Sequence, residues 1–336
     1  MGQSYLHACD QVPLSDLSQE HGQALKTTLA RVLDTEIAKR TFAQILDGLP
    51  LDQERYARPR VHPLVDGKCE VCSEAYNALE AFQNNFSFDM LRFDVKCLTC
   101  IQKAQAYQNC SFGGDEFKKH LLEMTAVAIH DIGVELFDRA DGGLHQVKYV
   151  PIEPLEELSE QSTEGTTKEQ ISPLFYHSDY FEWNQYPRGL ADCVGYWTEK
   201  SILGGVVVFD RGESGLEYND LYLHPNPPAR LFEVLPQQLQ AFVDFGTSAQ
   251  QNGKVSPPFP MRPRRYAKRL MEWQTHQLHI FRDVYERLPP RPDWRGPSCV
   301  RSLDDDVDFI YALHEAKESG VLPNDFNVPP LPPSDG

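Results

Sequence analysis

The chain has 336 residues, of which 41% are hydrophobic, and its formal net charge is −17. A chain of this length can bury a sizeable core, and we expect two domains or one domain with a large appendage. The acidic balance argues against attraction of the whole surface to nucleic acid. No apolar run approaches the roughly 20 residues that span a bilayer, and the polar start lacks the basic and apolar regions of a signal peptide. The sequence therefore predicts a cytoplasmic protein without a membrane partner.

The first part of the sequence is predicted to be helical. Apolar residues recur at a spacing of three to four from Leu14 to Leu49, which is the pattern of a helix with one buried face. The same pattern predicts helices over residues 97–107 and 115–137, and partial alternation predicts a strand over 145–152. We therefore assign residues 1–152 to a helical N-terminal region.

Within this region, two cysteine pairs have the spacing of metal-binding knuckles. Cys69 and Cys72 form the first pair, and Cys97 and Cys100 form the second. Four thiolates in two such turns can close a tetrahedral site around one structural Zn²⁺, which leaves no open position for chemistry. The 24 residues between the pairs are more than usual, so unrelated buried cysteines are the alternative. Should one of the four be wrongly chosen, the spare ligands are His62 and Cys110.

The composition changes twice in the second half of the chain. Residues 153–172 hold six glutamates and one lysine among small polar residues, which is typical of an acidic loop or linker. Residues 174–225 are rich in aromatic and β-branched side chains and are interrupted by glycines and prolines. They predict a strand, a turn and a β-meander. The last two strands of the meander are expected at 205–210 and 216–224.

Helices are expected to return after the meander. The predicted helices cover residues 237–245, 265–288 and 304–319, and a Pro-rich tail follows at 322–336. The expected fold class is therefore α+β. It combines the helical N-terminal region and its zinc knuckle, the linker, an α+β catalytic region over 173–321 with a small, mostly antiparallel meander and C-terminal helices, and the tail.

Two histidines and an aspartate in the meander region could bind a metal ion. His177 and Asp179 are two residues apart, so in a strand their side chains share one face, and His224 follows 45 residues after Asp179. This is the ligand order of a non-haem Fe(II) oxygenase with two histidines and one carboxylate. The alternative is that these histidines only form hydrogen bonds at strand ends.

Acidic side chains gather in the same region. Clustered carboxylates at the rim of a small sheet can bind a guanidinium group through paired, charge-assisted hydrogen bonds. The alternative is an acidic edge that faces water. The carboxylates concerned are Asp179, Glu182, Asp210, Glu213 and Glu217.

One segment is basic although the chain as a whole is acidic. Residues 261–301 carry ten basic and four acidic side chains, which gives the segment a charge of +6. The helix expected at 265–288 would keep an apolar stripe for the core and expose its basic faces, either to nucleic-acid phosphates or only to water. The candidate tRNA contacts are Arg262, Arg264, Arg265, Lys268 and Arg269.

Two short runs carry a resemblance to a known family. HSDYFEW from His177 to Trp183 and FDRGESG from Phe209 to Gly215 resemble fungal arginine-containing cyclodipeptide synthases, over about a sixth of the chain. The resemblance implies acyl transfer in secondary metabolism, from arginyl-tRNA and a second charged tRNA, to form a diketopiperazine. A charged tRNA is already activated, so neither ATP nor a nicotinamide cofactor is expected, and the chain has no G-x-x-x-x-G-K-[ST] motif.

The resemblance also suggests roles for individual residues. His177 is the expected base, because an unperturbed imidazole titrates near neutral pH, and Tyr180 or Tyr196 would supply a hydroxyl. The substrate guanidinium would be held by the carboxylates at positions 210, 213 and 217. Two other classes stay open: the Fe(II) oxygenase described above, and a zinc-stabilised interaction protein without enzymatic activity.

Overall fold

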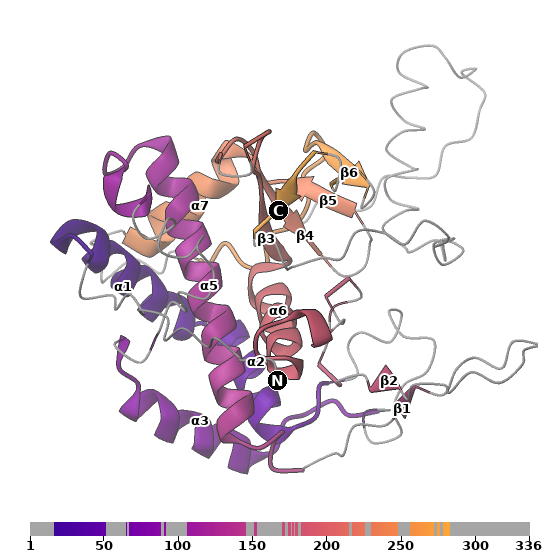
Figure 1. Ribbon diagram of the computed structural model, residues 1–336. Coiled ribbons are helices and arrows are strands. Elements are labelled where there is room, and N and C mark those ends of the chain that lie inside the picture. The colour runs from indigo at the N-terminus through magenta and orange to yellow at the C-terminus, as the bar shows by residue number, and fades with distance from the viewer. Residues whose placement is uncertain are drawn as a thin grey trace, which may run out of the picture.

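Figure 1 shows the computed structural model of the protein, in which helices gather on one side and a small sheet lies on the other. Every structural statement below concerns the residues that the structure describes. These are residues 17–51, 65, 67–88, 91, 106–145, 151–152, 170–171, 174–175, 177, 179–180, 183–214, 217–225, 230–247, 256–271, 274–275 and 278–282.

The long N-terminal helix expected from the sequence is two helices, α1 (Gln19–Leu33) and α2 (Glu36–Asp47). The break falls at Thr35, whose hydroxyl accepts a hydrogen bond from the Ala38 N–H at 3.3 Å and so begins a new helix. α2 ends at Gly48, whose φ of 89° is the left-handed conformation that stops many helices. The apolar spacing therefore predicted the helical content, and a local cap decided the break.

Helix α5 (Asp115–Arg139) confirms the helix predicted over residues 115–137 and forms the centre of the helical part. It runs through the middle of the molecule, with α6 (Leu190–Leu203) packed along it (Figure 1). α3 (Ser73–Asn85) packs against α2. α7 (Pro236–Thr247) packs against α1 and confirms the helix expected at 237–245.

Helix α6 corrects the sequence analysis, which read its residues as part of the meander. Two glycines allow the close packing of α5 and α6: a Cβ added at Gly195 would overlap the ring of His130, and one at Gly133 would overlap the Thr198 side chain. α6 is apolar on most sides because both α5 and the sheet cover it. Such a helix shows no amphipathic period that a sequence pattern could reveal.

The main sheet is antiparallel and has five strands in the order β6-β5-β4-β3-β7. The expected pair of meander strands is confirmed as β3 and β4, with Val206 opposite His224. A separate two-stranded pair joins β1 (Pro151–Ile152) to β2 (Gln170–Ile171), and η4 (Trp183–Gln185) precedes α6. The strands of the main sheet are β3 (Val206–Asp210), β4 (Leu221–His224), β5 (Arg230–Glu233), β6 (Arg269–Met271) and β7 (Ile280–Phe281).

The continuous helix expected over residues 265–288 is wrong: among the described residues of that range only 274 and 275 are helical, while 269–271 and 280–281 are strands. β6 pairs with β5 and β7 pairs with β3, so both short strands extend the sheet at its two edges. These backbone hydrogen bonds form with residues far along the chain, and they outweigh the local helical pattern. Arg282, expected on an exposed helix face, is 3% exposed.

Core residues from the predicted N-terminal and catalytic regions pack in one hydrophobic cluster, which includes Leu25, Phe42, Ile129, Val207 and Phe242. A second, smaller cluster lies around Tyr180 and Tyr196. The described residues contain no helix with both the length and the apolar character needed to cross a membrane. The helix expected at 304–319, the tail at 322–336 and most of the linker at 153–172 lie outside the described residues, as does the helix expected at 97–107 apart from its last two residues.

Candidate active site

The two histidines and the aspartate that the sequence grouped come together in the structure. Oδ2 of Asp179 lies 3.2 Å from Nε2 of His224 and 3.6 Å from Nδ1 of His177. His224 is the last residue of β4, while His177 and Asp179 belong to the segment before η4. Both imidazoles are fully buried and the Asp179 side chain is 11% exposed. The spacing in the sequence thus predicted a real cluster.

Tyr180 extends the cluster by one group. Its hydroxyl lies 3.1 Å from Nδ1 of His224, on the side of the ring away from Asp179. The three side chains form a row of carboxylate, imidazole and hydroxyl, which we call the relay (Asp179, His224, Tyr180). An imidazole held between a carboxylate and a hydroxyl is the arrangement that lets it take a proton from the hydroxyl, since the carboxylate stabilises the imidazolium that forms.

Both ring nitrogens of His177, which the sequence suggested as the base, form hydrogen bonds to the backbone. Its Nε2 donates to the backbone carbonyl of His224 at 3.0 Å, and its Nδ1 accepts the Asp179 backbone N–H at 3.2 Å. Both ring nitrogens are therefore used, and the hydrogen bonds fix which one carries the proton. The ring packs edge-on against Tyr180 and His224. His177 therefore holds the segment before η4 against the end of β4, and His224 is the histidine that contacts the Tyr180 hydroxyl.

Tyr196, the second tyrosine named from the sequence, packs against Tyr180 of the relay. Its ring stacks on Tyr180 with the centroids 4.6 Å apart. The edge of His130 meets it at 4.6 Å, and the guanidinium of Arg282 lies 5.4 Å from its centre. Tyr196 therefore connects the relay to a second group of buried polar residues.

This second group, which we call the ionic cluster, joins α5 and α6 to the end of β7. Nδ1 of His130 donates to Glu199 at 3.0 Å and Nε2 donates to Asp192 at 3.1 Å. Arg282 donates to the other oxygen of Glu199 at 2.7 Å. Burial alone would lower the pKa of His130, but the hydrogen bonds to the two carboxylates outweigh it and raise this pKa to about 9. The imidazole is therefore a cation at neutral pH.

The sequence analysis missed the ionic cluster because it assigned no helix to residues 190–203. One signal was present: Asp192 and Glu199 are seven residues apart inside an otherwise apolar run. In a helix this spacing puts both carboxylates on one face. Acidic residues in an apolar helix need buried partners, and the partners come from α5 and the chain after β7.

Of the carboxylates expected to bind a guanidinium, Asp179 belongs to the relay, whereas Asp210, Glu213 and Glu217 lie at the other end of β3. Val206 is opposite His224, and Asp210 is four residues further along, about 13 Å away in an extended strand. Asp210 accepts the Gly212 N–H at 2.9 Å. Glu217 accepts hydrogen bonds from Ser214 and Asn219, each at 3.2 Å. The structure does not bring these residues together with His177, and Glu182 lies outside the described residues.

The turn that carries these carboxylates also contains a buried arginine of the chain itself. Arg211 donates to Glu123 of α5 at 2.9 Å and to the backbone carbonyl of Arg282 at 3.0 Å. Its guanidinium also lies 4.4 Å from the centre of the Tyr218 ring. Arg211 therefore anchors the turn to α5 and to the chain after β7.

Four of the five basic residues named as tRNA contacts lie on the segment that leads into β6, which contains a turn closed by the Ala267 N–H and the Arg264 carbonyl, and Arg269 is the first residue of β6. Arg262, Arg264 and Lys268 are exposed, whereas Arg265 and Arg269 are half-buried. Tyr266 lies among them with 79% of its surface exposed, and the Arg265 guanidinium is 5.6 Å from its ring centre. The segment therefore presents cations and an aromatic ring together, although it is not helical.

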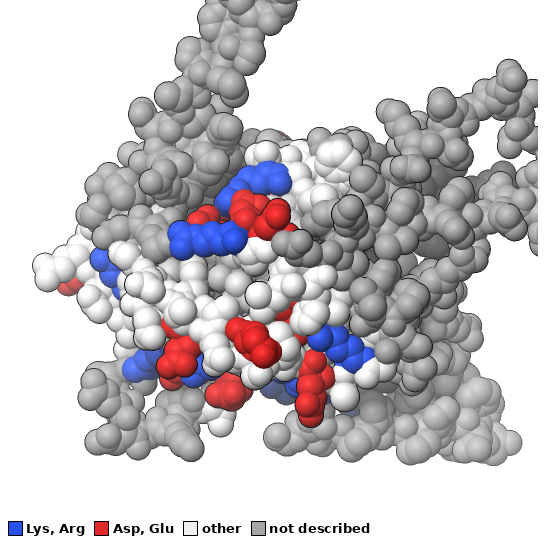
Figure 2. Space-filling view, turned by 90° about the horizontal axis from the view of Figure 1, so that it is seen from below, with Lys and Arg blue, Asp and Glu red and all other residues white. Residues whose placement is uncertain are grey.

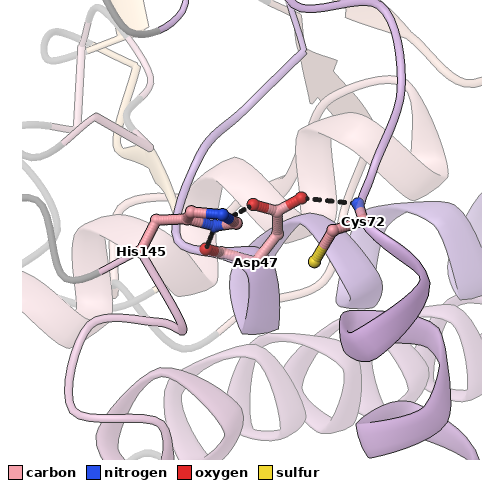
Figure 3. Close-up of side chains that lie close together, drawn as sticks. All are labelled: Asp47, Cys72 and His145. Carbon is pink, nitrogen blue, oxygen red and sulfur yellow. Dashed lines mark hydrogen bonds and ion pairs between the residues drawn. The ribbon is translucent and has the colours of Figure 1, made fainter.

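The predicted zinc ligands are described only in part. Cys69 is exposed and Cys72 is half-buried just before α3, while Cys97 and Cys100 lie outside the described residues. The four-thiolate site therefore stays a prediction. The structure adds a group that the sequence did not suggest, formed by Cys72, Asp47 and His145 (Figure 3).

Figure 2 shows no separate basic patch among the described residues on the lower face of the molecule. Figure 2 views the molecule from below, and the acidic and basic side chains of the described residues there are interspersed. Nucleic-acid binding normally uses a surface with an excess of positive charge. Of the described residues, those of the β6 segment remain the candidates for such a contact.

Comparison of the chain with protein-family models, with curated proteins and with solved structures finds no match.

Proposed function

We propose that this protein transfers aminoacyl groups from charged tRNAs and joins two of them into a cyclic dipeptide, with the relay as its reaction centre. The observation that carries the proposal is the row of Asp179, His224 and Tyr180, with contacts of 3.2 Å and 3.1 Å. Two of its three members come from the run that resembles arginine-containing cyclodipeptide synthases. These contacts support the proposal that the residues on which the resemblance rests form the reaction centre.

The reaction balances without a cofactor. The α-amine of one aminoacyl group attacks the ester carbonyl of the other, and the second amine then attacks the second ester, so that two amide bonds form and two ester bonds break. Each amine loses a proton, and each departing tRNA gains one on its terminal hydroxyl. The reaction requires a group that accepts the first proton and returns it. We assign this role to His224 acting through the Tyr180 hydroxyl, which its Nδ1 contacts.

Burial suits the relay to this chemistry. Tyr180 and His224 are fully buried, so charge that develops on the imidazole is stabilised by Asp179 and not by water. A dry site also protects the aminoacyl esters from hydrolysis. The preference for arginine rests on the resemblance alone, because the carboxylates at Asp210 and beyond lie further from the relay than one arginyl side chain reaches.

The β6 segment supports the choice of tRNA as the substrate carrier. The 3′ end of a tRNA is single-stranded, and single strands bind to surfaces that combine cations with exposed aromatic rings. Tyr266 and its neighbours Arg264 and Lys268 offer this combination. Contacts of this kind carry little sequence preference, which suits an enzyme that accepts two different tRNAs.

The test supplies arginyl-tRNA and a second aminoacyl-tRNA to the purified protein without ATP and measures diketopiperazines by mass spectrometry. Tyr180→Phe should remove most of the activity because the relay loses its hydroxyl. Tyr186→Phe is the matched control, since this tyrosine belongs to the same aromatic group but lies outside the relay. Equal activity of the two variants would remove the relay from the reaction, and no product with any charged tRNA would refute the proposed function.

A second candidate, an Fe(II) oxygenase, is favoured by one observation. The donor atoms of His177, Asp179 and His224 all lie within 4.8 Å of one another. The other ring nitrogen of each histidine meets a backbone carbonyl or a hydroxyl, as metal-binding histidines usually require. Against it, a metal ion would have to displace the Asp179 N–H from Nδ1 of His177.

An anaerobic Fe(II) titration and a separate aerobic activity assay together distinguish the two candidates. Stoichiometric binding that is lost in His177→Ala, together with oxygen consumption that stops on chelation, would favour the oxygenase. Diketopiperazine formation that persists in the presence of the chelator would favour acyl transfer.

A further inference from the structure

A fully buried carboxylate stands at the end of α2. Asp47 is the last residue of this helix, where the helix dipole disfavours negative charge. Its Oδ2 accepts the Cys72 backbone N–H at 2.9 Å, and Lys68 lies 3.1 Å from the same oxygen. Its Oδ1 lies 2.7 Å from Nδ1 of His145 (Figure 3). A buried anion at this end of a helix is costly, and it persists only because other groups compensate it.

The backbone fixes the position of His145. Its N–H donates to the Asp47 carbonyl at 3.1 Å, and the Leu144 N–H donates to the Leu46 carbonyl at 2.8 Å. The approach also depends on two glycines, because a Cβ added at Gly143 would overlap the backbone of Gly48. His145 therefore meets the end of α2 by construction, although its side chain is 46% exposed.

Cys72 completes the convergence. It is the N-cap residue of α3, directly before the first turn of that helix. One donor atom from each of Cys72, Asp47 and His145 lies within 4.8 Å of the other two. Thiolate sulfur, imidazole nitrogen and carboxylate oxygen are the three donor types that Zn²⁺ accepts.

We propose that one Zn²⁺ is bound by Asp47, Cys69, Cys72 and His145, and that this mixed site replaces the four-thiolate site expected from the sequence. Cys69 joins as the fourth donor because a C-x-x-C turn presents both thiolates to one metal ion. The ion takes the place of the proton between His145 and Asp47, so binding releases that proton.

The charges at this site are balanced. Two thiolates and one carboxylate carry three negative charges, and the ion with the Lys68 ammonium supplies three positive charges. A neutral set of groups is the least costly to bury. The ion would join the end of α2, the start of α3 and the chain at residue 145.

The decisive experiment replaces Zn²⁺ by Co²⁺ in the full chain, because the intensity of the sulfur-to-cobalt charge-transfer band counts the bound thiolates. We expect one equivalent of metal and a band for two thiolates. His145→Ala and Asp47→Asn should both weaken Zn²⁺ binding. We expect a loss of affinity of at least about 10- to 100-fold, which is the scale for groups that support a metal site. Cys97→Ser and Cys100→Ser should leave the affinity unchanged.

His279→Ala is the matched control, because this exposed histidine binds a backbone carbonyl through Nδ1 as His145 does and lies outside the site. Circular dichroism checks that the variants fold; the half-exposed position of His145 keeps that variant informative even where Asp47→Asn fails to fold. A band for four thiolates, or equal affinity of His145→Ala and His279→Ala, would overturn the proposal. Less than about half an equivalent of metal would do so too.

Discussion

The relay and the ionic cluster are connected through Tyr196, whose ring stacks on Tyr180 of the relay and contacts His130 of the ionic cluster, and both groups contain a buried histidine. In the ionic cluster, His130 faces two carboxylates, so its proton is held and its pKa is about 9. In the relay, His224 faces one carboxylate and one hydroxyl. The two histidines thus differ in their partners: two anions hold a proton on His130, whereas His224 lies between one anion and one hydroxyl, which is the basis of its proposed role as a proton acceptor.

Removing the relay imidazole should have the largest effect. His224→Gln should lower the rate of product formation by about 10² to 10⁴, the usual scale for loss of a general base. His130→Gln, in the ionic cluster, should lower the rate far less. Single-turnover rates with charged tRNA measure both. Similar losses in the two variants would end the distinction between the two histidines.

The ionic cluster should instead matter for stability. Glu199 is fully buried and pairs with both His130 and Arg282, so Glu199→Gln removes the counter-ion that these two buried cations share and should lower the free energy of unfolding by about 3–5 kcal/mol. Glu135→Gln breaks the exposed pair with Arg139 and should cost less than about 1 kcal/mol. Urea denaturation compares the two, and a small effect at Glu199 would contradict the assigned charges.

The pH dependence of stability sharpens the same contrast. The pKa of His130 is raised from 6.5 to about 9 in the folded protein, so its contribution is complete below pH 6.5 and is lost as the pH rises through 9. Burial raises the pKa of the neighbouring Asp131 from 3.8 to about 7. The contribution of this carboxyl group to stability is therefore lost as the pH rises from about 4 to 7. Unfolding curves from pH 6 to pH 9.5 should show a decline that His130→Gln flattens above pH 7. A decline of equal slope in that variant would contradict the assignment.

The smallest effect is expected at the exposed cations before β6. Replacing both Arg264 and Lys268 by alanine should weaken tRNA binding modestly and lower the slope of affinity against salt by roughly one for each residue. Lys118→Ala, on α5, is the control. Filter binding over a salt series measures the slopes, and identical slopes in all variants would place the tRNA elsewhere.

Part of the site could be predicted from the sequence. The spacing of His177, Asp179 and His224 indicated one cluster, which the structure contains. The strand expected at His177 and Asp179 is wrong, because the Tyr180 N–H donates to the His177 carbonyl at 3.0 Å and closes a turn there. The order of the contacts could not be predicted. Whether His177 or His224 meets the Tyr180 hydroxyl depends on where the segment before η4 crosses β4, and no local pattern records that crossing.

The sequence by itself determined the elements that carry a local pattern. α2, α5 and α7 could be recognised from apolar spacing, and β3 and β4 from short β-branched or aromatic runs bounded by turn residues. Only the tertiary structure decided α6, β6 and β7. α6 is covered on most sides and shows no period, and the two short strands depend on hydrogen bonds to β5 and β3, which lie far away in the sequence. The ionic cluster depends on two of these elements, α6 and β7. Its buried charges are tolerable only because α5, α6 and the end of β7 bring opposite charges together.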